Sequence, residues 1–266
     1  MLDRFDRSID YLRISVTDRC NLRCRYCMPE TGIKLLNHSD ILTYDEIYGF
    51  TAVAVKNGIR KVRITGGEPL VRKGIVSLVS MLSGIKGIED LSMTTNGVLL
   101  GEYASELKAA GLHRVNISLD TVDPARFNEI TRHDLLNSVL GGIEAALVAG
   151  LTPVKVNCVV KESQYEKDAV EVAKYCAEMG LEIRFIRQMD IVNGHFYVVN
   201  GGTGGDCSIC NRLRLTSDGK LKPCLFNDTE INIRETGFEQ AIKMAVQQKP
   251  ACGTRSINNK FYSIGG

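Results

Sequence analysis

Residues 11–27 read YLRISVTDRCNLRCRYC and place three cysteines directly after a short apolar segment. The segment Leu12–Val16 combines apolar and β-branched side chains, which predicts a buried strand. Cys20, Cys24 and Cys27 follow on the loop that leaves this strand. The first predicted strand therefore leads directly into a loop that carries three thiols.

Five more segments of this kind follow and alternate with segments of helical periodicity. Thr43 and Glu46 form a capping-box pattern that predicts the start of the first helix, and Gly58 is placed to end it. Because strand and helix alternate, the strands are expected to be parallel and joined by right-handed crossovers. We predict strands at Lys61–Thr65, Leu91–Thr94, Val115–Leu119, Val154–Val160 and Glu182–Ile186, and helices over residues 43–55, 80–82, 103–110, 136–147 and 168–179.

The number of strand–helix units separates the α/β architectures. Six units are two fewer than a closed (β/α)₈ barrel has, and about 190 residues are fewer than such a barrel usually takes. An incomplete (β/α)₆ barrel of the TIM type therefore fits, and a doubly wound sheet stays as the alternative. In both architectures the C-terminal ends of the strands carry the chemistry.

The pattern changes after the sixth predicted strand. A glycine-rich tract at residues 200–205 predicts an irregular connection. Beyond it lie a hairpin turn predicted at Ser217–Gly219 and a helix near residues 237–247. We therefore expect two regions, a partial barrel over residues 1–186 and a smaller C-terminal region over residues 187–266.

The composition is that of a folded, water-soluble protein. Apolar residues make up 44% and charged residues 24%, which excludes disorder for most of the chain. The net charge of +2 gives no overall indication of a nucleic-acid partner. No apolar stretch is long enough for a membrane span, and the opening residues are too polar for a signal peptide. We expect a cytoplasmic protein with no nucleic-acid or membrane partner.

Nine cysteines in such a chain indicate metal centres, because disulfides are uncommon in a reducing cytosol. The first group, Cys20, Cys24 and Cys27, has the spacing C-x₃-C-x₂-C. Three thiolates on one loop can hold three irons of a [4Fe–4S] cluster and leave the fourth iron open for a substrate or cosubstrate. The arginines between these cysteines would offset the negative charge of the cluster. The alternative is a zinc site that lacks one ligand.

A second group of three cysteines lies near the end of the chain. Cys207 and Cys210 are two residues apart, and Cys224 follows after thirteen intervening residues. A second metal centre fits this group. A zinc site that recruits Cys252 or His195 as a fourth ligand is the alternative that the spacing leaves open.

The loop Gly66-Gly67-Glu68-Pro69 follows the second predicted strand. Two glycines allow the backbone to approach a ligand closely. Taken alone, such a loop is also an ordinary turn at the end of a strand. Its position at the C-terminal end of a strand makes it a candidate binding loop beside the first cysteine group.

Together these motifs resemble those of one family, the GTP 3′,8-cyclases of molybdenum-cofactor biosynthesis, which are radical S-adenosylmethionine (SAM) enzymes. The C-x₃-C-x₂-C loop and the Gly-Gly-Glu-Pro loop resemble those of the whole radical SAM superfamily. The second cysteine group has the spacing of the cyclase family. The matching stretches span nearly the whole chain in family order: LRISVTDRCNLRCRYCMPE, VRITGGEPLVRK, LSMTTNG, RVNISLD, VKVNCVV, IRFI, CSICNRLRLTSDGKLKPCLF and the final Gly265-Gly266.

The resemblance implies cofactors and residue roles. It implies SAM and two [4Fe–4S] clusters, the first bound by Cys20, Cys24 and Cys27 and the second by Cys207, Cys210 and Cys224. It implies a SAM pocket formed by Tyr26, Gly66, Gly67, Glu68, Ser118 and Met189. It implies a GTP site formed by Arg13, Lys61, Arg63, Thr94, Lys155, Arg184, Arg212 and Arg214. It implies catalytic roles for Arg212, Arg214, Gly265 and Gly266.

The resemblance also implies a reaction and partners. An electron from the first cluster cleaves SAM, the 5′-deoxyadenosyl radical removes the 3′ hydrogen of GTP, and the C3′ radical attacks C8 of guanine. The implied partners are GTP, an electron donor similar to flavodoxin or ferredoxin, and cyclic pyranopterin monophosphate synthase, which receives the product. The oligomeric state is left undecided between a monomer and a homodimer.

The residues themselves support a site for a triphosphate. The sequence contains no G-x₄-G-K-[ST] motif, so side chains rather than a P-loop would hold the phosphates. A charge on an otherwise apolar strand is costly unless it lines a cavity with an anionic partner. For any single such residue, an internal ion pair is the alternative. The basic residues on predicted strands are Arg13, Lys61, Arg63, Lys155 and Arg184.

The chain departs from the family after its sixth predicted strand. Seventeen residues separate Met189 from Cys207, where the family usually has several dozen, and Arg187-Gln188 stands where an acidic and an aromatic residue are common. Two other functions stay as alternatives, a radical SAM enzyme that modifies peptides and a non-enzymatic iron–sulfur or zinc scaffold. The CxxCNRLR stretch and the Gly-Gly end disfavour the first, and the basic residues on strands disfavour the second.

Overall fold

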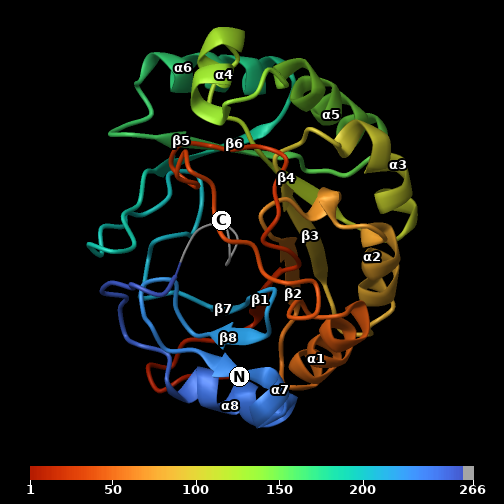
Figure 1. Cartoon of the computed structure of the whole chain (residues 1–266), viewed down its shortest axis with the longest axis vertical. Helices are drawn as coiled ribbons and strands as arrows, with labels where there is room; N and C mark the ends of the chain where they lie inside the picture. Colours follow the sequence, from red (N-terminus) through yellow and green to blue (C-terminus); the bar gives the residue numbers. More distant parts are fainter. Residues whose placement is uncertain (260–266) are drawn as a thin grey trace.

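One continuous sheet organises the chain. The structure, a computed structural model, describes residues 1–259, and nine strands within them form this sheet in the order β6-β5-β4-β3-β2-β1-β7-β8-β9 (Figure 1). Strands β1 to β6 are parallel, β7 is parallel to β1, and β8 and β9 continue the sheet as antiparallel strands. Their bounds are Tyr11–Ser15 (β1), Lys61–Thr65 (β2), Asp90–Thr95 (β3), Arg114–Ser118 (β4), Lys155–Val160 (β5), Glu182–Arg187 (β6), Arg212–Leu215 (β7), Lys220–Lys222 (β8) and Ile231–Asn232 (β9).

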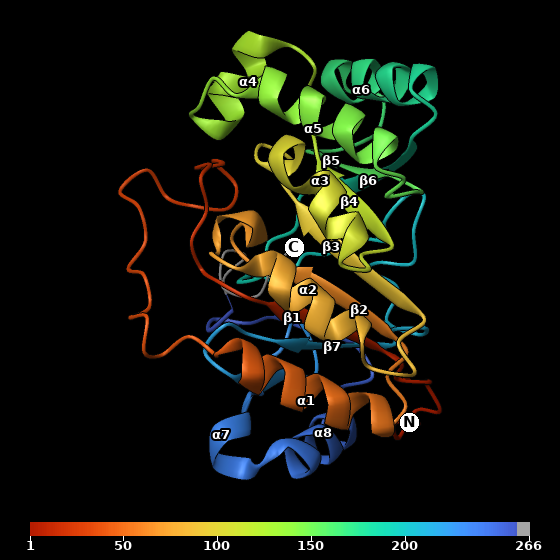
Figure 2. The same cartoon turned by 90° about the vertical axis from the view of Figure 1, so that its right-hand side faces the viewer.

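The helices cover the outer side of the curved sheet, so that its inner side faces the middle of the molecule (Figures 1 and 2). The sheet does not close. The predicted incomplete (β/α)₆ barrel is therefore confirmed, and the doubly wound alternative, which needs helices on both faces, is wrong. The helices are Tyr44–Lys56 (α1), Ile75–Ser83 (α2), Leu100–Ala109 (α3), Pro124–Thr131 (α4), Leu136–Val148 (α5), Lys167–Glu178 (α6), Ile233–Thr236 (α7) and Phe238–Gln247 (α8), with a 3₁₀ helix at Pro69–Val71 (η1).

Local sequence sets the start and end of α1 as predicted. The Thr43 hydroxyl accepts a hydrogen bond from the Glu46 backbone N–H (3.2 Å), and the Glu46 carboxylate accepts one from the Thr43 backbone N–H (2.7 Å). This reciprocal capping satisfies two N–H groups that the first helical turn leaves unpaired. Gly58 follows the helix with φ +103°, a conformation that glycine adopts without steric cost.

Alternation along the strands separates the core from the inner side of the sheet. Leu12 and Ile14 are fully buried in the apolar core, whereas the intervening Arg13 points to the opposite side of β1. Arg13 stands opposite Arg63 of β2 and opposite Arg214 of β7 in the strand register. Three neighbouring strands thus place three arginines side by side on the inner side of the sheet.

The C-terminal residues extend the same sheet. The turn predicted at Ser217–Gly219 is confirmed, because it joins the antiparallel strands β7 and β8, and the predicted last helix is α8. Strand β7 pairs with β1 along its length, so the sheet continues across the predicted boundary at residue 186, and the division into two regions stays a prediction. The sequence reasoning missed α4, whose apolar residues are too few to mark a long periodic stretch.

None of the helices that the described part of the chain forms has both the length and the apolar character needed to cross a membrane.

Candidate active site

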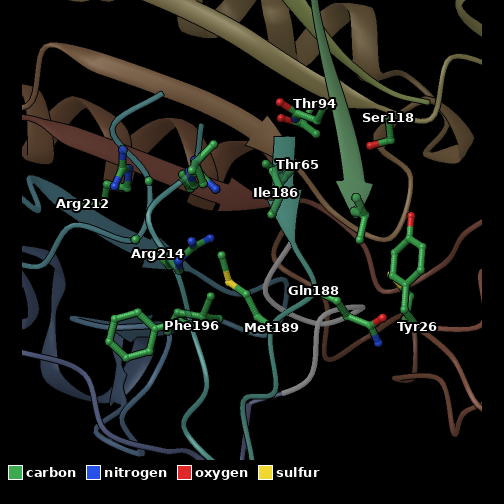
Figure 3. A pocket seen from close by; sticks show the side chains of 18 of the residues that line it. Tyr26, Thr65, Thr94, Ser118, Ile186, Gln188, Met189, Phe196, Arg212 and Arg214 are labelled. Atoms are coloured by element: carbon green, nitrogen blue, oxygen red, sulfur yellow. The ribbon is translucent and has the colours of Figure 1, made fainter. Parts of the chain in front are cut away.

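A cavity of about 320 Å³ opens at the C-terminal ends of the parallel strands, where the fold places chemistry. All six grouped cysteines line it, so the structure brings the two predicted groups to one cavity. Figure 3 shows Arg212 and Arg214 on one side and Tyr26 on the other, with Met189 between them. The cavity is of the size that small-molecule and cofactor sites usually have.

The first cysteine group lies on the loop that follows β1, as predicted. The Cys20 thiol accepts hydrogen bonds from the Leu22 backbone N–H (3.4 Å) and from the Asn96 side chain (3.7 Å). Burial raises the pKa of the Cys24 thiol to about 12, so this thiol is protonated at neutral pH until a metal displaces the proton. Three soft sulfur donors on one loop, facing a shared cavity, fit an iron–sulfur cluster with one open iron.

The Gly-Gly-Glu-Pro loop packs directly against the first cysteine loop. The Gly67 and Glu68 backbone N–H groups donate to the carbonyls of Thr17 and Arg19, each at 2.7 Å. A side chain at Gly67 would place its Cβ 2.4 Å from the Arg19 carbonyl oxygen, a contact no real Cβ makes. Glycine is therefore required for this approach, and the two predicted loops form one continuous wall.

Glu68 ties this wall to the loop after β3. Its carboxylate accepts hydrogen bonds from the Leu70 N–H (3.0 Å), the Thr95 hydroxyl (2.8 Å) and the Asn96 N–H (2.6 Å). Burial raises the pKa of Glu68 to about 7, although these hydrogen bonds act in the opposite direction. Asn96, which the sequence reasoning did not name, is thereby held beside Cys20. Its position directly after β3, in the stretch LSMTTNG, was the available indication.

The sequence reasoning also missed Asp120, which positions Tyr26, one of the predicted SAM residues. The Tyr26 hydroxyl donates to Asp120 (2.7 Å), and the Val159 backbone N–H donates to the other carboxylate oxygen (2.8 Å). Burial raises the pKa of Asp120 to about 6. The side chain follows β4 by two residues in the stretch RVNISLD, so a carboxylate at the C-terminal end of a strand was the indication.

The residues predicted for the SAM pocket all line the cavity: Tyr26, Gly66, Gly67, Glu68, Ser118 and Met189. They come from the first cysteine loop, the ends of β2 and β4 and the segment after β6. Figure 3 shows Tyr26 and Ser118 on the same side of the cavity. Their contact with SAM stays a prediction.

The second cysteine group lies on the segment before β7 and the segment after β8. The buried Lys249 ammonium donates to the carbonyls of Arg212 and Pro223, both at 2.7 Å. Burial by itself raises the pKa of the Cys210 thiol, but Lys249 and the Arg212 N–H outweigh it and bring the pKa below its usual value. Lys249 therefore braces the two segments that carry Cys210 and Cys224 and supplies positive charge to them.

Of the two residues that the zinc alternative offers as a fourth ligand, Cys252 lies near the second cysteine group and His195 does not. The Cys252 sulfur lies 3.1 Å from the Cys207 sulfur, but His195 is absent from the cavity lining and its backbone pairs with Asp190. Within residues 1–259, no group of three or more His, Cys, Asp or Glu side chains is gathered closely enough to hold a single metal ion.

The predicted GTP residues fall into three sets. Arg13, Thr94, Arg212 and Arg214 line the cavity. Arg63 is buried behind it and donates to the Ser92 hydroxyl (3.2 Å). Lys61 and Lys155 are outside the lining and form ion pairs, Lys61 with Asp10 (3.1 Å) and Lys155 with Glu182. Arg184 is also outside the lining, close to Gly201 and Gly202 of the glycine-rich tract.

Tyr11 stands at the centre of the arginines and was not predicted. The guanidinium carbons of Arg13, Arg63 and Arg212 lie 5.5, 5.4 and 5.7 Å from the centre of its ring. Burial by itself raises the pKa of Tyr11, but the three cations together lower it below its usual value. The ring separates like charges by favourable cation–π contacts. An aromatic residue two positions before Arg13 was the indication in the sequence.

Two residue pairs named in the sequence analysis still have to be placed, Arg187-Gln188 and Gly265-Gly266. Arg187 and Gln188, which stand where the family commonly has an acidic and an aromatic residue, both line the cavity, and the Arg187 guanidinium lies 3.9 Å from the centre of the Tyr197 ring. Gly265 and Gly266 lie outside the described residues.

The fold and the first cysteine loop define the class of protein, a radical SAM protein, and comparisons agree. Residues 14–176 match the Radical SAM superfamily. The structure resembles Streptococcus suis SuiB solved with bound S-adenosylmethionine, with a TM-score of 0.66, 17% identity, and coverage of 92% of this chain and 65% of that chain. It also resembles anSMEcpe solved with bound AdoMet (TM-score 0.55, 20% identity, 70% of this chain and 53% of that chain). These two likenesses show the fold.

The family within this class follows from the whole chain. Residues 182–253 match the family described as Molybdenum Cofactor Synthesis C. The chain is 44% identical to GTP 3′,8-cyclase of Moorella thermoacetica, covering 94% of each, and 40% identical to that of Petrotoga mobilis, covering 98% of this chain and 95% of the relative. The chain belongs to the GTP 3′,8-cyclase family of radical SAM enzymes, and its cofactors are SAM and [4Fe–4S] clusters.

These alignments also show a difference in length. They extend over 304 and 314 positions, more than the 266 residues of this chain, so both relatives carry residues that have no counterpart here. The short segment between Met189 and Cys207 likewise indicates that this chain has fewer residues than its relatives.

Proposed function

We propose that the cavity between the two cysteine groups binds GTP and SAM together, so that the chain joins C3′ of the ribose to C8 of guanine. The chain is a GTP 3′,8-cyclase and acts in molybdenum-cofactor synthesis. The observation that carries the proposal is the lining of one cavity by both cysteine groups and by Arg13, Arg212 and Arg214.

The first cysteine group and its neighbours form the SAM side. We assign Cys20, Cys24 and Cys27 to the first cluster, and Tyr26, Gly66, Gly67, Glu68, Ser118 and Met189 to SAM. When bound, the first cluster and SAM supply a 5′-deoxyadenosyl radical that takes the 3′ hydrogen of GTP. The chain contributes a fixed geometry, because Asp120 orients Tyr26 and Glu68 fastens the loops that meet at Cys20.

The second cysteine group and the arginines form the GTP side. Cys207, Cys210 and Cys224 would hold the second cluster, which would supply a binding position for the guanine base. Arg13, Arg212 and Arg214 hold the triphosphate from the lining, and Thr94 lies on the same wall. Arg63 is proposed to act from behind the lining. Arg184, Lys61 and Lys155 lie outside the lining and are proposed to reach the triphosphate only by moving, the two lysines after leaving Asp10 and Glu182. Guanidinium groups suit this task because they bind phosphate oxygens in pairs.

Catalytic roles are proposed for residues that face the reacting atoms. Arg212 and Arg214 line the same cavity as the second cysteine group, where their charges would stabilise the cyclised nucleotide. Gly265 and Gly266, which lie outside the described residues, are proposed to reach the same site because glycine permits close backbone approach.

The partners of this reaction are proposed from its chemistry. Each turnover consumes two electrons, one for the cleavage of SAM and one, with a proton, for the radical that remains after C3′ has joined C8. A flavodoxin-like or ferredoxin-like protein is therefore the proposed donor, and cyclic pyranopterin monophosphate synthase is the proposed recipient of the product. We place the reaction in the cytoplasm, where reduced donors of this kind occur, and we keep a homodimer as an assembly to be tested.

Two serine variants test the assignment of the cysteine groups. Cys24→Ser should abolish SAM cleavage, because the first cluster loses one of three thiolates. Cys210→Ser should keep reductive SAM cleavage but lose GTP binding, measured by equilibrium dialysis under anaerobic conditions. Iron analysis should give about eight irons in the parent and about four in each variant. Equal loss of all iron in both variants would contradict the assignment.

A further inference from the structure

Cys252 is a thiol that the cyclisation does not use, yet it touches a residue of the second cysteine group. Its sulfur lies 3.1 Å from the Cys207 sulfur, closer than two sulfur atoms usually pack. Cys252 is exposed, and Cys207 is partly buried. A disulfide requires the sulfur atoms to approach to about 2.05 Å, so a shift of about 1 Å would join them.

A buried guanidinium holds the two segments at this separation. One terminal nitrogen of Arg7 donates to the carbonyls of Cys207 (2.7 Å) and Ala251 (2.9 Å), and the other donates to Pro250 (2.6 Å). Asp3 fixes the guanidinium through an ion pair at 2.7 Å, and both side chains are buried. Because Arg7 binds the carbonyl of Cys207 and that of the residue before Cys252, it holds the backbone segments of the two cysteines next to each other.

Packing on the other side of Cys252 also restricts the pair. A side chain at Gly253 would place its Cβ 2.6 Å from Phe226 and 3.1 Å from the Cys224 sulfur. The Thr254 N–H donates to the Phe226 carbonyl at 2.9 Å. The turn after Cys252 is thus pressed against the segment that carries Cys224, and Cys252 has little freedom to move away from Cys207.

We propose that Cys207 and Cys252 form a reversible disulfide when the second cluster is absent, and that this bond withholds Cys207 from iron. The inference rests on the proposed role of Cys207 as a ligand of that cluster. A thiol cannot serve in a disulfide and as an iron ligand at once, so disulfide formation and cluster assembly exclude each other. The bond would also protect a ligand thiol from irreversible oxidation while iron is scarce.

The step balances with a small-molecule disulfide such as oxidised glutathione. The exposed Cys252 thiolate attacks one sulfur of the oxidant, forms a mixed disulfide and releases one glutathione thiolate. The Cys207 thiolate then attacks the Cys252 sulfur, which forms the protein disulfide and releases the second glutathione. The two protons of the protein thiols leave on the two glutathione molecules. Two protein thiols are oxidised, and one glutathione disulfide is reduced.

The first test maps disulfides in the cluster-free chain. The full chain is freed of iron with a chelator, incubated anaerobically with oxidised glutathione, alkylated and digested, and its peptides are identified by mass spectrometry. We expect a Cys207–Cys252 peptide pair as the main disulfide of the second cysteine group. Free Cys252 after this treatment, or its pairing with Cys210 or Cys224 instead, would overturn the proposal.

The second test measures iron uptake with matched variants. After oxidation, the parent should fill its second site at least tenfold more slowly than Cys252→Ser, and dithiothreitol should abolish the difference. Cys176→Ser is the control, because Cys176 is buried in α6, and it should behave like the parent. Equal uptake rates in the oxidised parent and Cys252→Ser would overturn the proposal.

One further variant separates this inference from the function on which it rests. Cys207→Ser should lose the iron of the second site without any oxidant. If it instead keeps that iron, the assignment of Cys207 as a ligand fails, whatever the disulfide map shows. If it loses the iron and Cys252 stays free in the oxidised parent, the function stands and the disulfide is refuted.

Discussion

At the scale of single residues, the site is defined by cations that crowd together. Arg13 stands opposite Arg63 and Arg214 in the register of three neighbouring strands. Burial, together with the neighbouring charge of Arg13, lowers the pKa of Arg63 and of Arg214 to about 9. Like charges in a partly buried site repel one another strongly. A polyanion such as a triphosphate would relieve this repulsion.

Arg214 offers the first prediction. Arg214→Ala should weaken GTP binding by about 10- to 100-fold, because a charge-assisted hydrogen bond to phosphate is worth about 1.5–3 kcal/mol. The salt dependence of the dissociation constant should also decrease. Isothermal titration of the cluster-loaded chain measures both, and guanosine should bind the parent and the variant equally.

A surface variant controls for this measurement. Lys243→Ala removes an exposed cation on α8 that forms an ion pair with Glu239, one turn earlier in the same helix (2.8 Å). It should leave GTP affinity unchanged. If Arg214→Ala binds GTP as the parent does, the arginines serve the fold and not the triphosphate.

Glu68 predicts a pH dependence of stability. Its pKa is raised from the ordinary 4.5 to about 7, so the folded chain holds this proton more tightly than the unfolded chain. The resulting stabilisation is full below pH 4.5 and is lost as the pH rises through 7. Relative to Glu68→Gln, the parent should lose about 3 kcal/mol of unfolding free energy between pH 5 and pH 8. Urea unfolding of both cluster-free chains measures it, and parallel curves would refute the prediction.

At this scale, the sequence predicted the site residues that belong to a short contiguous motif and missed those whose partners are distant in the sequence. The first cysteine group and the Gly-Gly-Glu-Pro loop each lie within a few residues, the second cysteine group spans residues 207–224, and the structure brings all three to one cavity. Asn96, Asp120 and Lys249 escaped prediction, because their partners lie on other segments and only the fold reveals the contacts. Lys61 and Lys155 have carboxylate partners, which is the alternative that the sequence left open.

At the scale of elements, the ends of strands and the loops after them carry the function. Predicted strands agreed with the observed ones within one residue at either end, because β-branched runs and glycine punctuation mark them clearly. The predicted hairpin turn implied β7 and β8 without giving their bounds. The strand β9 and the helices α4 and α7 were missed, since a few residues give no measurable periodicity, and only residues 80–82 of α2 were predicted. The glycine-rich tract after β6 forms no helix or strand, as predicted.

The close contact of two loops gives the third prediction. Gly67→Ala should cost about 2 kcal/mol or more of unfolding free energy, because its Cβ would collide with backbone atoms that cannot yield cheaply. SAM binding should fall in parallel as the loops separate. Thermal unfolding and dialysis with labelled SAM measure the two effects.

Gly141 in α5 is the matched control. Apart from its chain neighbours and the backbone of its own helix, no atom of the described residues lies within 4 Å of a Cβ built there. Gly141→Ala should therefore stabilise the chain by about 0.5–1 kcal/mol, because alanine loses less backbone entropy in a helix. Equal effects of the two substitutions would show that the loop contact does not determine the requirement for glycine.

At the scale of the whole molecule, the sheet joins the two halves of the reaction. Strand β1 leads into the first cysteine loop, and β7, its neighbour, follows Cys207 and Cys210 of the second cysteine group. Arg7 and Lys249 tie the beginning and the end of the described chain to that second group. The pairing of β1 with β7 was beyond sequence reasoning, because no local pattern specifies which strand extends an open sheet.

The central claim is that one cavity holds SAM and GTP in contact, so that hydrogen passes from C3′ of the ribose to the deoxyadenosyl group. The most direct measurement uses the cluster-loaded chain with SAM, a reductant and GTP deuterated at C3′, under anaerobic conditions. The account predicts 5′-deoxyadenosine that carries the deuterium, formed in an amount equal to the cyclised nucleotide. Deoxyadenosine without deuterium, or without cyclised nucleotide, would contradict it.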